Sequence, residues 1–273
     1  MNGAGNDFVI VDNRQLRLPD EAWPEIARAL CERHLSIGAD GLMVVDPSEK
    51  ADYRMRYYNS DGSLGEMCGN GARCICRYGY ENGLAGEVQT VETTAGLVTG
   101  WRLDQRNYRI RLNDPSVIRL DAAAGIGGTV YATPYVELGD PGLPHIAVEM
   151  PGLADCDRQQ LRELGRQLRF YEGYPKGANV NFYEIVGPDH VQELTYERGV
   201  EDFTYACGTG TGSVVTVLTL LGRVSGQRVQ VDVPGGQLTV DVVRDGRRVA
   251  DLFLTGPTNI VCKGQVTDED LAI

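Results

Sequence analysis

Two cysteines, each followed by a glycine-rich turn, are the residues of this sequence best suited to acid–base chemistry. They open the motifs Cys68-Gly-Asn-Gly71 and Cys207-Gly-Thr-Gly210. Each motif leads into a segment that we predict to be helical, residues 72–80 after the first and the apolar run 213–222 after the second. The first N–H groups of a helix lack partners within it and attract negative charge, so they can bind an anion and stabilise a thiolate.

A pair of thiols can invert a carbon stereocentre. One thiolate removes a proton from one face of the carbon while one thiol delivers a proton to the other face. We therefore expect Cys68 and Cys207 to face one cleft and to exchange roles with the direction of the reaction, with no cofactor and no metal. The N–H groups expected to hold the carboxylate of a small-molecule substrate are those of Gly69, Asn70, Gly208 and Thr209.

The two motifs belong to an internal duplication. The interval from Gly38 to Cys68 equals the interval from Gly177 to Cys207. The longer interval from Asn6 to Cys68 likewise equals the interval from His145 to Cys207. Because such intervals recur in the same order in both halves, the sequence predicts two copies of one structural unit.

The register of the duplication singles out further polar residues. His145 occupies the position that Asn6 has in the first copy, so we expect it to be functional rather than structural. Glu197-Arg198 precedes Cys207 by the same interval by which Tyr58-Asn59 precedes Cys68. The planar guanidinium of Arg198 suits a carboxylate, and we expect Glu197 to contact an amine or a histidine.

The composition excludes several classes of protein. A net charge of −12 over 273 residues argues against nucleic acid or an anionic membrane surface as a partner. We find no run apolar enough to span a bilayer and no secretory signal, and seven cysteines without small-scaffold spacing indicate a reducing cytoplasm. The abrupt start on a glycine loop leads us to expect that a short strand preceded residue 1.

Strands outnumber helices and come in runs, which predicts an α+β fold rather than a doubly wound sheet. We expect two pseudo-symmetric domains, each a mixed, mostly antiparallel sheet curled around a central helix. The first comprises residues 1–115 with the tail 256–273, and the second comprises residues 116–255. A helix over residues 21–34, capped by Asp20, and a flexible linker over residues 122–128 complete the prediction.

Other interpretations compete for the cysteines. The commonest role of a free thiol is a buried structural one, which we expect for Cys31, Cys74, Cys76, Cys156 and Cys262. A redox disulfide between Cys68 and Cys207 would make the protein a redox-sensing dithiol module. The glycine turns lack the Gly-Lys-Ser/Thr of a phosphate-binding loop, and no Cys-x-x-Cys pair indicates zinc.

Short motifs that carry a family resemblance extend over nearly the whole chain. They are Gly3-Ala-Gly-Asn-Asp-Phe8, Asn59-Ser-Asp-Gly-Ser63, Cys68-Gly-Asn-Gly-Ala-Arg73, Ala178-Asn-Val-Asn-Phe182, Glu197-Arg-Gly199, Ala206-Cys-Gly-Thr-Gly210, Pro234-Gly-Gly236 and Thr255-Gly-Pro257. With these motifs the chain resembles the diaminopimelate epimerases, which invert one end of diaminopimelate for lysine and cell-wall synthesis. The resemblance implies an isomerase that is independent of pyridoxal phosphate and metal and forms a homodimer.

The resemblance also implies roles for individual residues. Cys68 and Cys207 would be the acid–base pair, supported electrostatically by His145 and Glu197. The turns at Gly69-Asn70 and Gly208-Thr209 would hold the carboxylate at the reacting end of the substrate. The residues implied for the distal amino-acid end are Asn6, Asn59, Asn179, Glu197 and Arg198.

The chain departs from the family pattern at three positions. Leu143 stands where many members carry asparagine in Gly-Asn-Pro-His, and leucine offers no hydrogen bond. Cys262 stands where some members have a tyrosine at the dimer interface, and Gly41 replaces a glutamine that some members use near the substrate. These departures leave a second function possible, which is that of a racemase of the same fold that acts on another amino acid, such as histidine.

Overall fold

The computed structural model describes residues 1–65, 68–267 and 271, and the chain forms two compact units. Unit 1 comprises Met1–Ile110 and Gly256–Ile273, and unit 2 comprises Arg111–Thr255. Both units consist mostly of strands with few helices, which confirms the predicted α+β class. Among the residues that the structure describes, the helices are too short or too polar to cross a bilayer.

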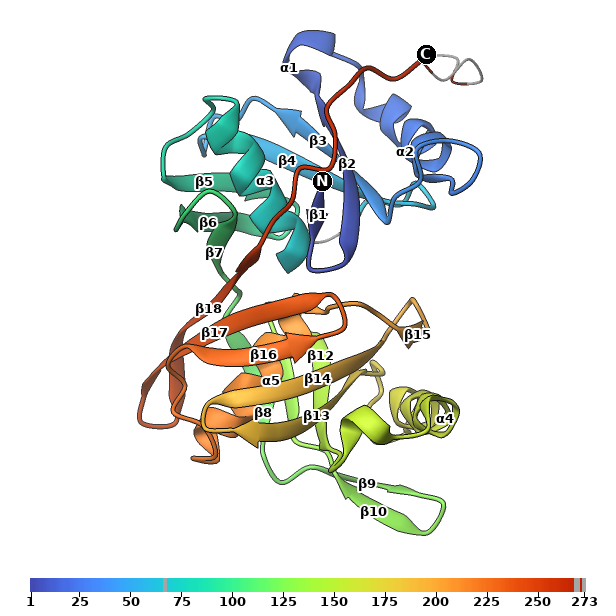
Figure 1. Cartoon of the computed structure of the whole chain (residues 1–273), viewed down its shortest axis with the longest axis vertical. Coiled ribbons are helices and arrows are strands. Elements are labelled where there is room, and N and C mark those ends of the chain that lie inside the picture. Colours follow the sequence, from blue (N-terminus) through green and yellow to red (C-terminus); the bar gives the residue numbers. More distant parts are fainter. Residues whose placement is uncertain (66–67, 268–270, 272–273) are drawn as a thin grey trace. The chain divides into compact units, whose positions relative to one another are not determined.

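Unit 1 is one mixed sheet with helices on its faces (Figure 1). Its strands follow chain order across the sheet, with β2 parallel to β3, β4 parallel to β5 and the other neighbours antiparallel. The strands are β1 (Asn2–Gly3), β2 (Asn6–Asp12), β3 (Gly41–Asp46), β4 (Tyr53–Asn59), β5 (Val88–Thr93), β6 (Gly96–Arg102) and β7 (Asn107–Arg111). The helices are α1 (Asn13–Leu16), η1 (Asp20–Ala22), α2 (Trp23–Cys31) and α3 (Gly69–Glu81).

The alternation of side chains along β3 lets both faces of the unit 1 sheet pack against helices. Leu42 and Val44 join the apolar cluster formed with α2, while Met43 meets the first turn of α3 at Gly71. The helix predicted over residues 21–34 is shorter than expected, because η1 precedes it and it ends at Cys31. The prediction that Asp20 caps this helix is wrong, since its carboxylate pairs with Arg56 at 2.6 Å instead.

Unit 2 repeats the mixed-sheet design. The order across its sheet is β18-β17-β16-β14-β13-β12-β11-β8, with β15 paired to β14 and a separate β9–β10 hairpin. The strands are β8 (Pro115–Arg119), β9 (Ala123–Ile126), β10 (Thr129–Ala132), β11 (Tyr135–Leu138), β12 (Leu143–Glu149), β13 (Asn179–Gly187), β14 (His190–Glu197), β15 (Asp202–Phe203), β16 (Val229–Val233), β17 (Gly236–Asp245) and β18 (Arg248–Pro257). The helices are η2 (Leu153–Asp155), α4 (Arg158–Arg169) and α5 (Gly208–Leu220).

Helix α5 is the buried centre of unit 2, and the strands of this unit curve around it (Figure 1). Every residue from Gly210 to Thr219 is buried, as the uniformly apolar sequence predicts. The run is rich in valine and threonine, whose helix propensity is low, but burial on all sides outweighs that local preference. The sheet's other face packs against α4 through a separate apolar cluster that includes Leu161, Leu168 and Phe182.

The strand pairings confirm the internal duplication. In unit 1, β2 pairs parallel with β3, β3 antiparallel with β4, and β4 parallel with β5. In unit 2, β12, β13, β14 and β16 repeat the same sequence of parallel, antiparallel and parallel pairs. The two glycines at equal intervals before the cysteines share a left-handed backbone, with φ of 76° at Gly38 and 65° at Gly177. A side chain would strain both positions, which explains why glycine occurs in both copies.

The flexible linker predicted over residues 122–128 is instead ordered structure. Strand β9 pairs antiparallel with β10, and Gly127-Gly128 forms the turn between them with both φ values positive. Such a turn matches the twist of the two strands, and it needs glycine or a similarly permissive residue. The alanine- and glycine-rich composition therefore reflects a hairpin rather than flexibility.

Burial of α5 leads to a prediction about stability. Leu218→Ala removes a fully buried side chain, and we expect it to lower the free energy of unfolding by about 2–5 kcal/mol. The matched control is Leu221→Ala at the end of the same helix, where the side chain is 46% exposed and the expected change is below about 0.5 kcal/mol. Urea denaturation followed by circular dichroism measures both changes. Equal effects of the two substitutions would contradict the central position of α5.

Candidate active site

In unit 2, Cys207 is the residue that immediately precedes α5. Its backbone is extended, with φ of −115° and ψ of 102°, and its carbonyl accepts the N–H of Thr211 at 2.9 Å. Its side chain makes no capping hydrogen bond to the helix, and Sγ lies 3.6 Å from the hydroxyl of Thr209. Because cysteine does not cap the helix as serine or aspartate would, the N–H groups of Gly208 and Thr209 at the start of α5 stay available for another acceptor.

The surroundings of Cys207 favour the protonated thiol. Burial raises the pKa of Cys207 well above its ordinary value, and the carboxylate of Glu197 raises it further. The hydroxyl of Thr209 and the N–H of Gly210 lower the pKa in part. Cys207 is therefore a thiol at neutral pH in the substrate-free protein and can donate a proton.

In unit 1, Cys68 occupies the equivalent place before α3. Its φ of −100° and ψ of 119° resemble those of Cys207, and its carbonyl accepts the N–H of Ala72 at 2.8 Å. Again the cysteine makes no side-chain capping bond to the helix. The two cysteines thus share one local geometry, as the spacing of the motifs predicts.

A buried arginine distinguishes the surroundings of Cys68. Arg73 is completely buried in α3, and burial lowers its pKa to about 10, although attraction to Cys74 and Cys68 raises it in part. Its guanidinium donates to Asn70 Oδ1 at 2.8 Å. A guanidinium remains cationic at neutral pH at this pKa, so its charge favours negative charge at Cys68.

A chain of polar contacts fixes Asn6 beside the start of α3. The amide of Asn70 donates to Asn6 Oδ1, and Asn6 Nδ2 donates to Asp40 Oδ2 at 3.0 Å. Arg33 holds the other oxygen of Asp40 at 2.9 Å. The structure therefore brings together three of the predicted residues of unit 1: Cys68, Asn70 and Asn6.

The remaining predicted residues of unit 1 are placed by backbone structure. Gly69 is the first residue of α3, directly after Cys68. Asn59 is the last residue of β4, and its Nδ2 donates to Ser63 Oγ at 2.9 Å. In the strand register, Asn59 lies opposite Gly41 of β3. Gly41 cannot be replaced by a larger residue without rearrangement, because an added Cβ would collide with the ring of Tyr57.

In unit 2 the predicted residues gather at the ends of β12, β13 and β14. His145 pairs with Asn179 across the parallel strands, and Glu197 is the last residue of β14. Asn179 Oδ1 accepts the N–H of Arg198 at 2.8 Å, and its Nδ2 donates to the carbonyl of Pro144 at 3.0 Å. Asn179 therefore holds the strand ends together, while the guanidinium of Arg198 donates to the carbonyl of Lys176 at 3.1 Å.

His145 is buried and neutral. Burial lowers its pKa to about 3, and the nearby charge of Arg198 lowers it further. Asn181 Nδ2 lies 3.5 Å from Nδ1 and makes its shorter bond to the carbonyl of Ile146 at 2.9 Å. Among the described residues, Nε2 of His145 has no hydrogen-bond partner. This nitrogen is therefore available for a contact with a ligand.

A row of buried polar side chains in unit 2 was not predicted from the sequence. Asn181, Thr195 and Glu193 lie on the same face of the unit 2 sheet as His145 and are at most 3% exposed. Their signal in the sequence is a polar residue at every second position of strands that are otherwise apolar. Leu143, two positions before His145, extends the same face with an apolar side chain.

The prediction that the other five cysteines are buried structural residues is confirmed only in part. Cys31, Cys74 and Cys76 are buried, and burial raises the pKa of the Cys76 thiol to about 12. Cys156 is half-buried. The prediction is wrong for Cys262, which is exposed because it lies in the irregular segment after β18.

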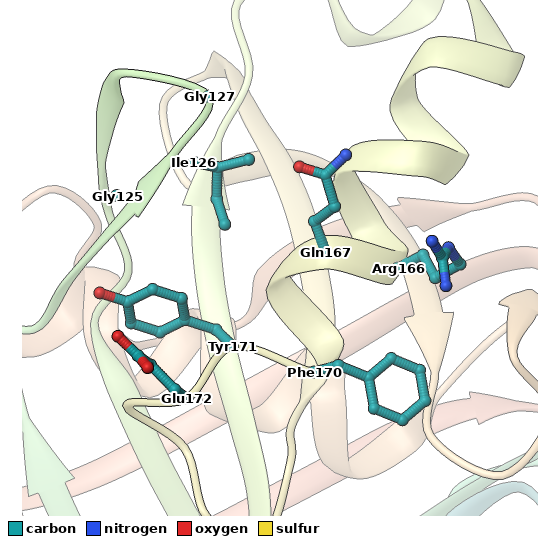
Figure 2. A pocket seen from close by; sticks show the side chains of 8 residues that line it. All are labelled: Gly125, Ile126, Gly127, Arg166, Gln167, Phe170, Tyr171 and Glu172. Atoms are coloured by element: carbon teal, nitrogen blue, oxygen red, sulfur yellow. The ribbon is translucent and has the colours of Figure 1, made fainter.

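A surface hollow of about 430 Å³ lies elsewhere in unit 2 (Figure 2). It lies between the turn of the β9–β10 hairpin and the end of α4, and the lining residues are Gly125, Ile126, Gly127, Arg166, Gln167, Phe170, Tyr171 and Glu172. None of the predicted site residues is among them. This hollow therefore has no part in the chemistry of the cysteines.

Neutral His145 leads to a testable prediction. Its pKa of about 3 means that the imidazole should not titrate between about pH 5 and about pH 8. The ¹⁵N shifts of its ring should stay constant over this range, with His145→Gln used to assign the signal. A titration midpoint near 6.5 would contradict the buried, neutral state.

The same depressed pKa also affects stability. The unfolded histidine takes up a proton near pH 6.5, whereas the folded one does so only near pH 3. His145 therefore lowers stability progressively as the pH falls from about 6.5 to about 3. His145→Gln should be less sensitive to acid over this interval than the unchanged protein. Thermal denaturation of both proteins at several pH values within the interval measures the difference.

Comparisons with known proteins agree on one family. The diaminopimelate epimerase family model matches residues 1–117 and 139–261. The diaminopimelate epimerase of Archaeoglobus fulgidus is 37% identical over 278 residues, which cover 97% of this chain and 94% of that protein.

Solved structures show the same fold at low sequence identity. A Bacillus anthracis phenazine biosynthesis protein of the PhzF family has a TM-score of 0.71 and 18% identity, covering 94% of this chain and 91% of that one. A hydroxyproline epimerase from Agrobacterium vitis has a TM-score of 0.67 and 19% identity, covering 94% and 86%. The identity over nearly the full length of the chain, together with the family match, shows that this protein belongs to the diaminopimelate epimerase family.

Proposed function

We propose that this protein is a cofactor-independent epimerase that interconverts LL- and meso-diaminopimelate by proton exchange at Cα between Cys68 and Cys207. The observation that carries the proposal is the repeated geometry of the two cysteines. Each precedes a buried helix, each has an extended backbone, and neither caps its helix. Membership of the family supports diaminopimelate as the substrate.

The charges in each unit suggest how the roles are divided at the start of the reaction. The cation of Arg73 favours a thiolate at Cys68, whereas burial and Glu197 favour a thiol at Cys207. In one direction, the Cys68 thiolate removes the Cα proton, and the electron pair left on carbon spreads into the carboxylate. The Cys207 thiol then delivers its proton to the opposite face. Cys68 ends as a thiol and Cys207 as a thiolate, so the reverse reaction starts from exchanged roles.

Helix N-termini would stabilise the negative charge that develops on the carboxylate. The N–H groups of Gly69 and Asn70 open α3, and those of Gly208 and Thr209 open α5. N–H groups at the start of a helix favour an anion, and the interaction strengthens as the charge of the anion grows. In the tautomer that carries its proton on Nε2, His145 would be a further donor in unit 2, since this nitrogen has no partner among the described residues.

The distal amino-acid end of diaminopimelate would be recognised by Asn6, Asn59, Asn179, Glu197 and Arg198. Asn179 already gives both ends of its amide to the backbone, so its contribution is to hold Arg198 in place. An amino acid with a single amino-acid end cannot offer both a second carboxylate to the guanidinium and a second amine to Glu197. The racemase of another amino acid, such as histidine, is the second candidate, because Leu143 removes one polar group from this face.

We further propose that the enzyme acts as a homodimer in the cytoplasm, as the family resemblance implies. The seven cysteines are free thiols, which suits a reducing compartment. A redox-sensing dithiol module would also use free thiols. It offers no role, however, for the arginine and the asparagines that surround the cysteines.

The cysteine mechanism predicts that both thiols are required. We expect Cys68→Ser and Cys207→Ser each to retain less than about a tenth of the epimerase activity, a loss of roughly 1.4 kcal/mol or more in the barrier. The matched control is Cys156→Ser, which changes a half-buried thiol outside the site and should leave activity unchanged. Activity is measured by deuterium incorporation at Cα from heavy water. Substantial activity in either single variant would remove that cysteine from the chemistry.

The substrate assignment predicts a severe effect of Arg198→Met. Loss of a charged, paired contact to the distal carboxylate should lower kcat/KM for LL-diaminopimelate by about 100-fold or more, roughly 2.7 kcal/mol. Arg247→Met, in the exposed turn between β17 and β18, is the control and should change little. The unchanged enzyme is compared on LL-diaminopimelate, histidine, lysine, glutamate and proline. More efficient turnover of any of the last four would overturn the assignment of diaminopimelate.

A further inference from the structure

A buried carboxyl group contacts the helical turn that carries Cys207. Glu193 lies in β14 and is 2% exposed. Its Oε2 accepts the hydroxyl of Thr211 at 2.6 Å. Thr211 belongs to the first turn of α5, and its N–H donates to the carbonyl of Cys207 at 2.9 Å. Two hydrogen bonds thus connect Glu193 to the backbone of Cys207.

Glu193 belongs to the polar row that also reaches His145. Thr195, two positions along β14, donates to Asn181 Oδ1 at 3.0 Å, and Asn181 Nδ2 lies 3.5 Å from His145 Nδ1. Helix α5 packs tightly on this row, since a Cβ at Gly210 would collide with Asn181 Oδ1. A change at Glu193 therefore acts on Cys207 through a rigid contact rather than through solvent.

The burial of Glu193 makes its charge dependent on pH near the working range. Among the described residues no cation forms an ion pair with it, and Oε1 has no hydrogen-bond partner. An uncompensated buried carboxylate is costly, so burial raises the pKa of Glu193 to about 8, although the hydroxyl of Thr211 lowers it in part. At pH 7 Glu193 is therefore mostly a neutral acid, and above about pH 8 it is mostly a carboxylate.

The groups that face Cys207 come from two elements. Strand β14 contributes the carboxyl groups of Glu197 and Glu193, both of which disfavour negative charge on the thiol. The start of α5 contributes the hydroxyl of Thr209 and the N–H of Gly210, which favour it. Of the two carboxyl groups, Glu193 is the one buried completely and held to α5 by a hydrogen bond.

We propose that Glu193 is a positioning residue that holds the first turn of α5 through Thr211 and, as a carboxylate in alkaline solution, keeps Cys207 in its thiol form. Its consequence for turnover rests on the proposed function. When Glu193 loses its proton to solvent, the new negative charge opposes ionisation of Cys207. The proton that the thiol donates in the reaction is then retained to higher pH, which extends the alkaline limit of activity.

The test is a titration of the Cys207 thiolate by its ultraviolet absorbance. Each protein is measured against its own Cys207→Ser version, so that the difference reports Cys207 alone. Glu193→Gln has nearly the same shape and can bond to Thr211, but it cannot ionise. We expect the midpoint of Cys207 ionisation in Glu193→Gln to lie about half a pH unit or more below that in the unchanged protein. The reason is that the negative charge of the Glu193 carboxylate, which opposes the thiolate, has been removed. An unchanged midpoint would overturn the proposal.

A second variant keeps the test informative if Glu193→Gln folds poorly. Thr211→Val removes the hydroxyl that stabilises the carboxylate form of Glu193 while keeping the size of the side chain. Glu193 should then ionise at higher pH, and the ¹³C shift of its carboxyl group should show this as a higher titration midpoint than in the unchanged protein. A shift in the opposite direction, or none, would contradict the role of the Glu193–Thr211 contact.

Turnover provides the functional readout. In Glu193→Gln, the alkaline limb of the kcat/KM profile for LL-diaminopimelate should move to lower pH by about half a unit or more. The value of kcat/KM at pH 7 should change by less than about threefold. A merely structural role would lower activity at all pH values without moving the limb. If the thiolate midpoint shifts but the unchanged protein does not epimerise diaminopimelate, the proposed function fails and the role of Glu193 stands. Normal epimerisation without either shift would refute the role of Glu193 alone.

Discussion

A buried helix that begins at an uncapped cysteine is the constraint on which each unit depends. The first N–H groups of such a helix need an acceptor, and neither Cys68 nor Cys207 supplies one from its side chain. The first turn of each helix also packs closely on its neighbours, since a Cβ at Gly71 or Gly210 would collide with a neighbouring residue. Close packing and burial therefore fix the first turn relative to the thiol, and in the proposed function the N–H groups of this turn bind the substrate carboxylate.

The duplication repeats the backbone but not the charges. Near Cys68 lies the buried cation of Arg73, whereas Cys207 faces two carboxyl groups, Glu197 and Glu193. Two thiols in identical surroundings would have the same pKa, so neither would be the preferred place for the thiolate. In the proposed function, the cation of Arg73 favours the thiolate at Cys68, whereas burial and Glu197 favour the thiol at Cys207. The equivalent positions in the two units thus differ where the proposed chemistry needs them to differ.

Much of the fold and the main residues of the site could be predicted from the sequence, because both depend on spacing along the chain. Equal intervals predicted the duplication, and the long apolar run predicted α5 despite its valines and threonines. The polar row was missed because Glu193 and Thr211 meet only through the register of β14 against the helix, which sequence spacing does not reveal. The hairpin of β9 and β10 was missed because its short strands contain alanine and glycine, which resemble a linker in composition.

In the proposed function, recognition of the distal amino-acid group depends on fewer side chains than the motifs alone indicate. Asn179 bonds the carbonyl of Pro144 and the N–H of Arg198, so its amide is already occupied. Leu143 lies on the same strand face as His145 and offers only an apolar surface. Within the proposed function, the guanidinium of Arg198 and the carboxylate of Glu197 therefore provide most of the charge recognition in unit 2. Selectivity for a substrate with two amino-acid ends then follows from the position of Arg198, which Asn179 holds in place.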